Sequence, residues 1–325
     1  MRSLPYVTGA AALFLLLAAT PAAASGSDSD SDFTIEDPRI TESSGLAASR
    51  THPGIYWTHN DQDQPRVFAV DSKTGKTVAT VTLQGVGTPR DMEAISIGPD
   101  GKVYVGDIGD NKDGTWNHVW IYTFPEPEAL RDMSVQATQY TVKYADGPRN
   151  AEALMVHPKT GRVYIASKNE DSGGLYEGPA RLSSTKTNTF RRIGEVPWVT
   201  DGAFSPDGTR LVLRSYFSAR GYEWKNGRLG DDYRVRAPMQ GQSEAVTYTA
   251  DGKALMFGSE GEGSEVRRVA VERGDGGGGS PSQGGNPSSG ASGETGERGG
   301  FTYGAIVLVV AAALVLGVKR LRRRG

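Results

Sequence analysis

The chain has 325 residues, contains no cysteine and carries a formal net charge of −2 at pH 7, so disulfides, zinc–thiolate sites and a cysteine nucleophile are excluded. Six of the 36 basic residues lie at the two ends, and the region between them therefore holds 30 basic against 38 acidic residues. This acidic balance argues against nucleic acid as a partner, because phosphate binding needs a basic face, and it is compatible with cation binding.

The N-terminus has the layout of a secretory signal peptide over residues 1–24. A basic residue, Arg2, precedes the apolar run Ala10–Ala19, and Ala22–Ala24 has the small-residue pattern of a cleavage site. Residues 25–32 follow as an acidic spacer in which Ser and Asp alternate. We therefore expect an exported protein.

Residues 33–272 repeat a pattern of two short β-rich runs joined by a tight turn, as in WD40-like repeats. In the clearest copy, Arg90–Asn111, the turn Pro99-Asp100-Gly101 separates Met92–Gly98 from Lys102–Gly106. Further copies begin at Ser44, Asn150, Asp201 and Ser243. Recurrence at roughly this blade-sized spacing predicts an all-β fold, a β-propeller of about five blades. Six blades are the alternative, because Arg131–Ala145 has room for an extra strand pair.

The last repeat, Ser243–Glu272, has room for only three strands. Phe33–Ile40 can form one strand, and we expect it to supply the missing outer strand of that blade. Closing the ring in this way leaves no unpaired sheet edge. Truncating Phe33–Ile40 is then expected to destabilise the whole ring.

Composition changes abruptly after residue 272. Residues 273–300 form a Gly/Ser-rich linker, and Phe301–Val318 is an uncharged apolar run that as a helix of about 27 Å just spans a bilayer. The basic tail 319–325 places the C-terminus in the cytoplasm and the propeller outside the cell. We therefore expect a single-pass protein of the cell membrane. Covalent attachment to the cell wall by a sortase is the alternative, although Ser292-Gly293 stands where a sortase signal has its Leu-Pro or Leu-Ala pair.

In a propeller, the start of each innermost strand and the loop after the second strand lie on one face of the ring. This geometry predicts that carboxylates gather at the mouth of the central channel, namely Glu93, Asp107, Asp110, Glu152 and Glu244. Converging carboxylates suit a hard cation such as Ca²⁺, which takes six to eight oxygen ligands. Bases on the same face could hold a phosphate or carboxylate ligand. These residues are Arg90, Arg149, Lys168, Arg214 and His59.

Three interpretations of the acidic residues stay open at this point. Besides binding a cation, glutamates at strand starts could cap backbone N–H groups or pair with Arg90 and Arg149, and a catalytic role is the third alternative. The loops bring Asn60, Asp61 and Glu260 to the same face. An aromatic cluster in the fourth repeat could pack between blades or stack on a sugar or another planar ligand. Its members are Tyr216, Phe217, Tyr222 and Trp224.

The order of five short motifs resembles a group of actinobacterial secreted or membrane-anchored propellers, which are distantly similar to propeller phytases and esterase-like propellers. The motifs are Asp91–Glu93, Gly106–Asn111, Asn150–Ala153, Ser205–Gly208 and Ser243–Ala245. The resemblance covers Ser44–Glu272. Propeller phytases are calcium-dependent phosphohydrolases with an acidic central channel, so the resemblance implies such a channel at Glu93, Asp107, Glu152 and Glu244.

The sequence as a whole predicts a surface-displayed, membrane-anchored β-propeller that acts as an extracellular binding or scaffold module. Calcium at the central channel is the candidate cofactor, and the plasma membrane is contacted through one helix. The ligand would be an extracellular small molecule, a glycan or a protein. The alternative is a calcium-dependent phosphohydrolase or esterase of the propeller phytase type, so whether the chain is an enzyme stays open.

Overall fold

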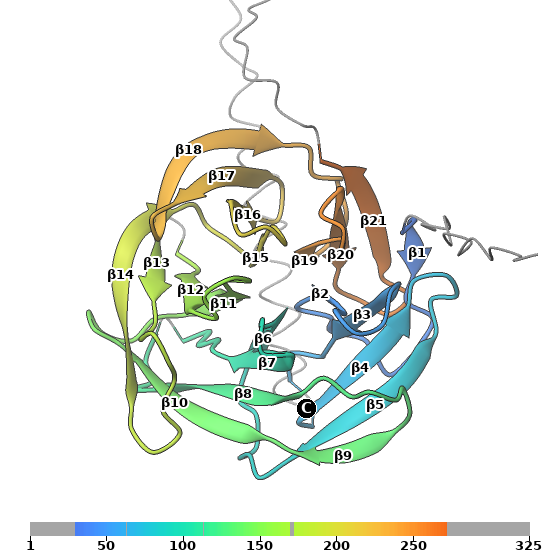
Figure 1. Cartoon of the computed structure of the whole chain (residues 1–325), viewed down its shortest axis with the longest axis horizontal. Helices are drawn as coiled ribbons and strands as arrows, with labels where there is room; N and C mark the ends of the chain where they lie inside the picture. The colour runs from blue at the N-terminus through green and yellow to red at the C-terminus, as the bar shows by residue number, and fades with distance from the viewer. Residues whose placement is uncertain (1–29, 63, 113, 170–171, 272–325) are drawn as a thin grey trace, which may run out of the picture. The chain divides into compact units, whose positions relative to one another are not determined.

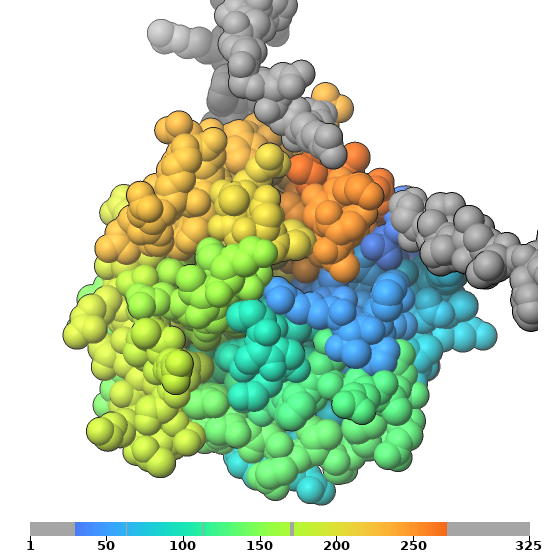
Figure 2. Space-filling model, viewed as in Figure 1, coloured from blue at the N-terminus to red at the C-terminus, as the bar shows by residue number. Residues whose placement is uncertain are grey.

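Twenty-one β-strands make up the regular structure of the residues that the computed structural model describes, which are 30–62, 64–112, 114–169 and 172–271. The strands form five antiparallel blades around a common centre (Figure 1). In the space-filling view the blades are successive sectors in chain order, from blue to orange (Figure 2). The all-β propeller predicted from the repeats is confirmed.

Each blade runs from an inner strand at the centre to an outer strand. Blade 1 consists of β2 (Ala47–Ala48), β3 (Ile55–Thr58), β4 (Arg66–Asp71) and β5 (Thr77–Gln84). Blade 2 consists of β6 (Met92–Ile97), β7 (Lys102–Asp107), β8 (Val119–Pro125) and β10 (Thr138–Tyr144). Blade 3 consists of β11 (Ala151–Val156), β12 (Val163–Ser167), β13 (Gly173–Glu177) and β14 (Asn188–Val196). Blade 4 consists of β15 (Asp201–Phe204), β16 (Arg210–Arg214), β17 (Ala219–Lys225) and β18 (Arg228–Val235). Blade 5 consists of β19 (Ser243–Tyr248), β20 (Ala254–Ser259), β21 (Glu265–Ala270) and β1 (Phe33–Thr34).

The core lies between the blades. Five clusters of buried hydrophobic side chains each draw on two neighbouring blades, so that every blade is packed on both faces. The inner strands contact one another in the order β6, β11, β15, β19 and β2, and β2 returns to β6. Packing on both faces leaves the inner strands β6, β11 and β19 buried along almost their whole length. Five interfaces close the ring, and the described residues therefore form five blades.

The segment that left room for a sixth blade divides between two existing ones. Its second half, β10, pairs antiparallel with β8 as the fourth strand of blade 2. Its first half, β9 (Met133–Gln136), pairs parallel with β5 and is a fifth strand on blade 1. β10 also pairs parallel with β14, which joins blades 2 and 3 into one sheet of eight strands.

The N-terminal strand closes the last blade as the sequence predicts. Phe33 pairs with Val266 and Thr34 with Glu265, so β1 is the outer strand of blade 5. The strand is shorter than the expected Phe33–Ile40, but the chain beyond it stays attached, because the Ile35 N–H donates to the Ser264 carbonyl at 2.9 Å. Ile35 and Ile40 are buried between blades 5 and 1.

The flanking segments of the prediction lie outside the described residues. These are the signal peptide (1–24), most of the spacer (25–32), the linker (273–300), the membrane span (301–318) and the tail (319–325). Across residues 30–271, apart from the gaps given above, the chain has no helix of the length and apolarity needed to cross a bilayer.

Candidate functional site

Three of the five inner strands begin with the same irregularity. In β6, β11 and β19 the pairing with the second strand skips one residue, and the skipped residues are Glu93, Glu152 and Glu244. A residue skipped in this way belongs to a β-bulge, which bends the strand and re-aims the side chain. Each of the three glutamates is 3% exposed. The repeated glutamates of the sequence are therefore bulge residues at the starts of three inner strands, and we call this end of the ring centre the mouth of the channel.

Lys168, which follows β12, lies among these three glutamates. Its Nζ is 3.0 Å from Glu152 Oε1. Burial lowers the pKa of the Lys168 ammonium, but attraction by Glu152, Glu244 and Glu93 outweighs burial and holds the pKa well above its usual range. The structure thus brings together residues from blades 2, 3 and 5 at one mouth of the channel.

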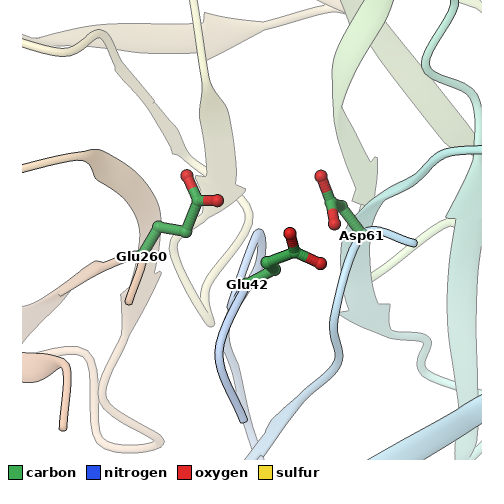
Figure 3. A group of neighbouring side chains, drawn as sticks. All are labelled: Glu42, Asp61 and Glu260. Atoms are coloured by element: carbon green, nitrogen blue, oxygen red, sulfur yellow. The ribbon is translucent and has the colours of Figure 1, made fainter. Parts of the chain in front are cut away.

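Two groups of carboxylates lie at the same mouth. The inner trio is Asp61, Asp91 and Glu93, all buried, and one carboxylate oxygen from each lies within 4.8 Å of the other two. The outer trio is Glu42, Asp61 and Glu260, with the same spacing, and its side chains point toward a common space (Figure 3). Asp61 belongs to both trios. Carboxylates from blades 1, 2 and 5 therefore form one continuous acidic stretch.

Backbone hydrogen bonds position the residue that the two trios share. The Asp61 N–H donates to the Glu42 carbonyl at 3.1 Å, and the Met92 N–H donates to the Asp61 carbonyl at 2.8 Å. The Asn60 side chain accepts from the N–H groups of Thr41 and Glu42. The loop after β3 is thereby fastened to the segments that lead into β2 and β6.

Side-chain amides orient two of the acids. Asn111 Nδ2 donates to Asp91 Oδ2 at 2.8 Å, and Gln242 Nε2 donates to Glu260 Oε2. Sequence reasoning did not select Glu42 or Asp91 as site residues. The spacing of Asp91 and Glu93 was an available signal for Asp91, whereas Glu42 precedes the first recognisable repeat and carried none.

Asp107 and Asp110 lie outside both trios and serve local structure. Asp107 accepts hydrogen bonds from the N–H groups of Arg90 and Asp91 and from the Tyr122 hydroxyl at 2.6 Å. Asp110 accepts from the Thr115 hydroxyl and from the Trp116 N–H. These two carboxylates, which the sequence places among the candidate cation ligands, satisfy backbone donors at the hairpin edge.

Arg90 and Arg149 are also engaged away from the trios. The Arg90 guanidinium lies between two indole rings, 4.1 Å from the centre of Trp116 and 3.9 Å from that of Trp120. Arg149 pairs with Asp146 at 3.0 Å and donates to the Tyr176 hydroxyl at 2.8 Å. Both guanidiniums support blades 2 and 3 in this arrangement.

Arg214 is a buried base on the blade 4 side of the channel. It donates to the Ala245 carbonyl at 3.0 Å and to Gln240 Oε1 at 2.9 Å. Burial lowers its pKa to about 10, and attraction by Glu244 and Asp201 opposes this shift. Burial in turn raises the pKa of Asp201 well above its usual range. Arg214 therefore links blade 4 to blade 5 and lies near Glu244 and Asp201.

His59 is fully buried, and its Nδ1 lies 3.2 Å from the Asn60 carbonyl oxygen. Burial lowers the pKa of its imidazole to about 4. Its Nε2 has no hydrogen-bond partner among the described residues and lies close to Gly45. A neutral, enclosed imidazole is suited to packing rather than to holding an anionic ligand.

The aromatic cluster of the fourth blade separates into two parts. Tyr222 and Trp224 are buried between blades 3 and 4, which is the packing role. Tyr216 and Phe217 lie in the loop after β16, where Tyr216 accepts a hydrogen bond from Lys168 Nζ at 2.8 Å. Phe217 is 57% exposed. The second part is an aromatic surface next to the acidic mouth.

Comparisons with known proteins add little to this geometry. No family model and no curated protein matches the chain. Among solved structures, a gluconolactonase from Xanthomonas campestris is similar at 12% identity, with 74% of this chain and 89% of that chain covered and a TM-score of 0.44. A chain of a mitotic checkpoint complex is 12% identical over 70% of this chain and 60% of that chain, with a TM-score of 0.37. Neither likeness carries an argument about function, and the propeller assignment rests on the strand topology.

Proposed function

We propose that this chain is an extracellular β-propeller that binds a divalent cation, Ca²⁺, at the mouth of its central channel. The observation that carries the proposal is the inner trio, three buried carboxylates with one oxygen from each within 4.8 Å of the other two. Like charges buried at this separation repel, and burial adds a desolvation cost to each of them. A cation between them relieves both effects.

The donor set favours a hard ion. All the ligand atoms of the two trios are carboxylate oxygens, which suit Ca²⁺, Mg²⁺ and Mn²⁺ rather than metals that prefer nitrogen or sulfur. The carboxylates come from loops and strand starts of three blades, and this gives the variable geometry that Ca²⁺ accepts more readily than Mg²⁺. Water would complete the six to eight oxygens of a Ca²⁺ ion.

The proposal also includes the location of the propeller outside the cell. A signal peptide and a C-terminal membrane span would display the propeller outside the cell, where Ca²⁺ is abundant and a binding or scaffold module can meet its ligand. The exposed ring of Phe217 beside the acidic mouth supports a binding role, because an exposed aromatic side chain offers a stacking surface for a small molecule, glycan or protein.

A cation-dependent hydrolase is the second candidate, and the charge of the mouth bears on its substrate. Among the described residues, seven carboxylates gather there against two buried bases, Lys168 and Arg214. The acids are Glu42, Asp61, Asp91, Glu93, Glu152, Glu244 and Glu260. Even with a divalent ion bound, the formal charge stays negative and disfavours a phosphate ester. A neutral ester or lactone fits better, since the ion would polarise its carbonyl and a carboxylate could act as general base.

The test is a calcium titration of the full-length protein by calorimetry and thermal melting. Wild type should bind Ca²⁺ and melt at a higher temperature, chelation should reverse the shift, and Glu93→Gln should lose it. Glu223→Gln is the matched control, because Glu223 is an acid of similar chemistry that pairs with Lys225 on the surface of blade 4. If Ca²⁺ gives neither binding heat nor a melting shift in wild type, the proposed function is wrong.

A panel of phosphate esters, carboxylic esters and lactones separates the two candidates. Turnover of an ester or lactone that stops on chelation and in Glu93→Gln would favour the hydrolase. Calcium binding without turnover of any member would favour the binding module.

A further inference from the structure

Lys168 is held in place more firmly than a surface lysine. Its backbone N–H donates to the Asn150 carbonyl at 2.9 Å, and its side chain is 13% exposed. The ammonium is 3.0 Å from Glu152 Oε1, donates to the Tyr216 hydroxyl at 2.8 Å and lies 4.8 Å from the centre of the Tyr216 ring. The backbone contact and the side-chain contacts with Glu152 and Tyr216 therefore fix one positive charge at a defined point of the mouth.

That point is where carboxylates of three blades meet. Glu152, Glu244 and Glu93 all attract the Lys168 ammonium, and they outweigh burial enough to keep it charged. Glu93 is also a member of the inner trio. The lysine and the proposed ion thus share one glutamate, with the lysine on the side of blades 3 and 5 and the ion on the side of blades 1 and 2.

We propose that Lys168 is a built-in cation that occupies the carboxylates of blades 3 and 5 in place of a metal, so that the mouth accepts one divalent ion and not two. The inference rests on the proposed cation site at the inner trio. An ammonium is a compact point charge with three donors, and it can offset part of the negative charge of Glu152 and Glu244 without the six to eight oxygens that Ca²⁺ requires.

The shared glutamate makes the two cations interact. A fixed unit charge weakens the binding of a nearby divalent ion because like charges repel, and a tenfold loss of affinity corresponds to about 1.4 kcal/mol of repulsion. Lys168 would therefore set both the number of ions and the affinity of the one that binds. A purely structural lysine would affect stability and leave the stoichiometry of binding unchanged.

Calorimetric titration of full-length protein with Ca²⁺ tests the inference. We expect wild type and Lys168→Arg to bind one ion, and Lys168→Met to bind a second ion while holding the first about tenfold more tightly. Lys225→Met is the control, because it removes a lysine that pairs with one glutamate at 2.6 Å on the surface. It should bind as wild type does.

The outcomes separate this inference from the proposed function. One ion at unchanged affinity in folded Lys168→Met would overturn the inference and leave the proposed function standing. An ion bound by Lys168→Met but not by wild type would overturn the proposed function and also the inference, which requires one ion in wild type. No ion in either protein would overturn both. If circular dichroism shows that Lys168→Met is unfolded, Lys168→Gln, which keeps a hydrogen bond to Tyr216, decides the question by the same criteria.

Discussion

Ring closure by β1 should make the stability of the whole propeller depend on one buried side chain, Ile35. Ile35 is 1% exposed and packs between blades 5 and 1, whereas its neighbour Thr34 is exposed on the same segment. Ile35→Ala removes three buried side-chain carbons and leaves a cavity, which costs about 2–5 kcal/mol. Because the free energy of unfolding of a domain is about 5–15 kcal/mol, this change is a large fraction of the total.

The assay is equilibrium unfolding in urea, followed by tryptophan fluorescence and by circular dichroism. The five tryptophans lie in blades 1 to 4 and none in blade 5, which contains β1, so an effect on the whole ring must appear in their signal. We expect one cooperative transition at a lower midpoint for Ile35→Ala, a melting temperature lower by roughly 5–15 °C, and no change for Thr34→Ala. An unchanged fluorescence midpoint in Ile35→Ala, with faster hydrogen exchange confined to blade 5, would refute closure as the source of global stability.

Three further predictions concern single side chains. Glu126 is buried and accepts hydrogen bonds from Trp57 Nε1 at 2.9 Å and from Ser49 at 2.6 Å. Glu126→Ala should therefore lower the free energy of unfolding in urea by about 2–4 kcal/mol. Glu128 lies on the surface, and Glu128→Ala should change this free energy almost not at all. A Cβ on Gly109 would lie 2.6 Å from Asp91 Oδ2, so Gly109→Ala should displace the inner trio. Calorimetry should then show Ca²⁺ binding weakened at least about tenfold. Gly87 has open space around it, and Gly87→Ala should bind Ca²⁺ normally. Burial raises the pKa of Tyr164 to about 12, above its unfolded value of 10.0. The contribution of Tyr164 to stability is therefore complete below pH 10 and falls as the pH rises toward 12. When unfolding is measured from pH 8 to 12, this loss should be about 2 kcal/mol smaller in Tyr164→Phe.

The blades could be predicted from the sequence because each hairpin repeats the same kind of turn between two β-rich runs. Closure of the ring could also be predicted, because the last repeat lacks one strand and Phe33–Ile40 belongs to no other repeat. The segment around β9 was ambiguous because its sequence fits a β-strand but does not indicate which strand it pairs with. Only the fold shows that β9 pairs with β5 across a blade boundary.

Only part of the candidate site could be predicted from the sequence. Glu93, Glu152 and Glu244 could be selected because the ring carries equivalent strand starts to one mouth, and the structure adds that each is a bulge residue. Asp107 looked equivalent to them because it ends the same hairpin, yet it bonds backbone N–H groups. A sequence does not distinguish a carboxylate that caps a strand edge from one that faces the channel, and Glu42 reaches the mouth through a non-repeating loop.

The most direct test of the account is an anomalous-difference map from crystals of the protein soaked in Mn²⁺ or a lanthanide, which replace Ca²⁺ in oxygen sites. The account predicts one strong peak bonded to Asp61, Asp91 and Glu93, with the Lys168 ammonium still on Glu152. A well-ordered mouth without a peak, or a peak bonded only to residues outside the inner trio, would contradict it.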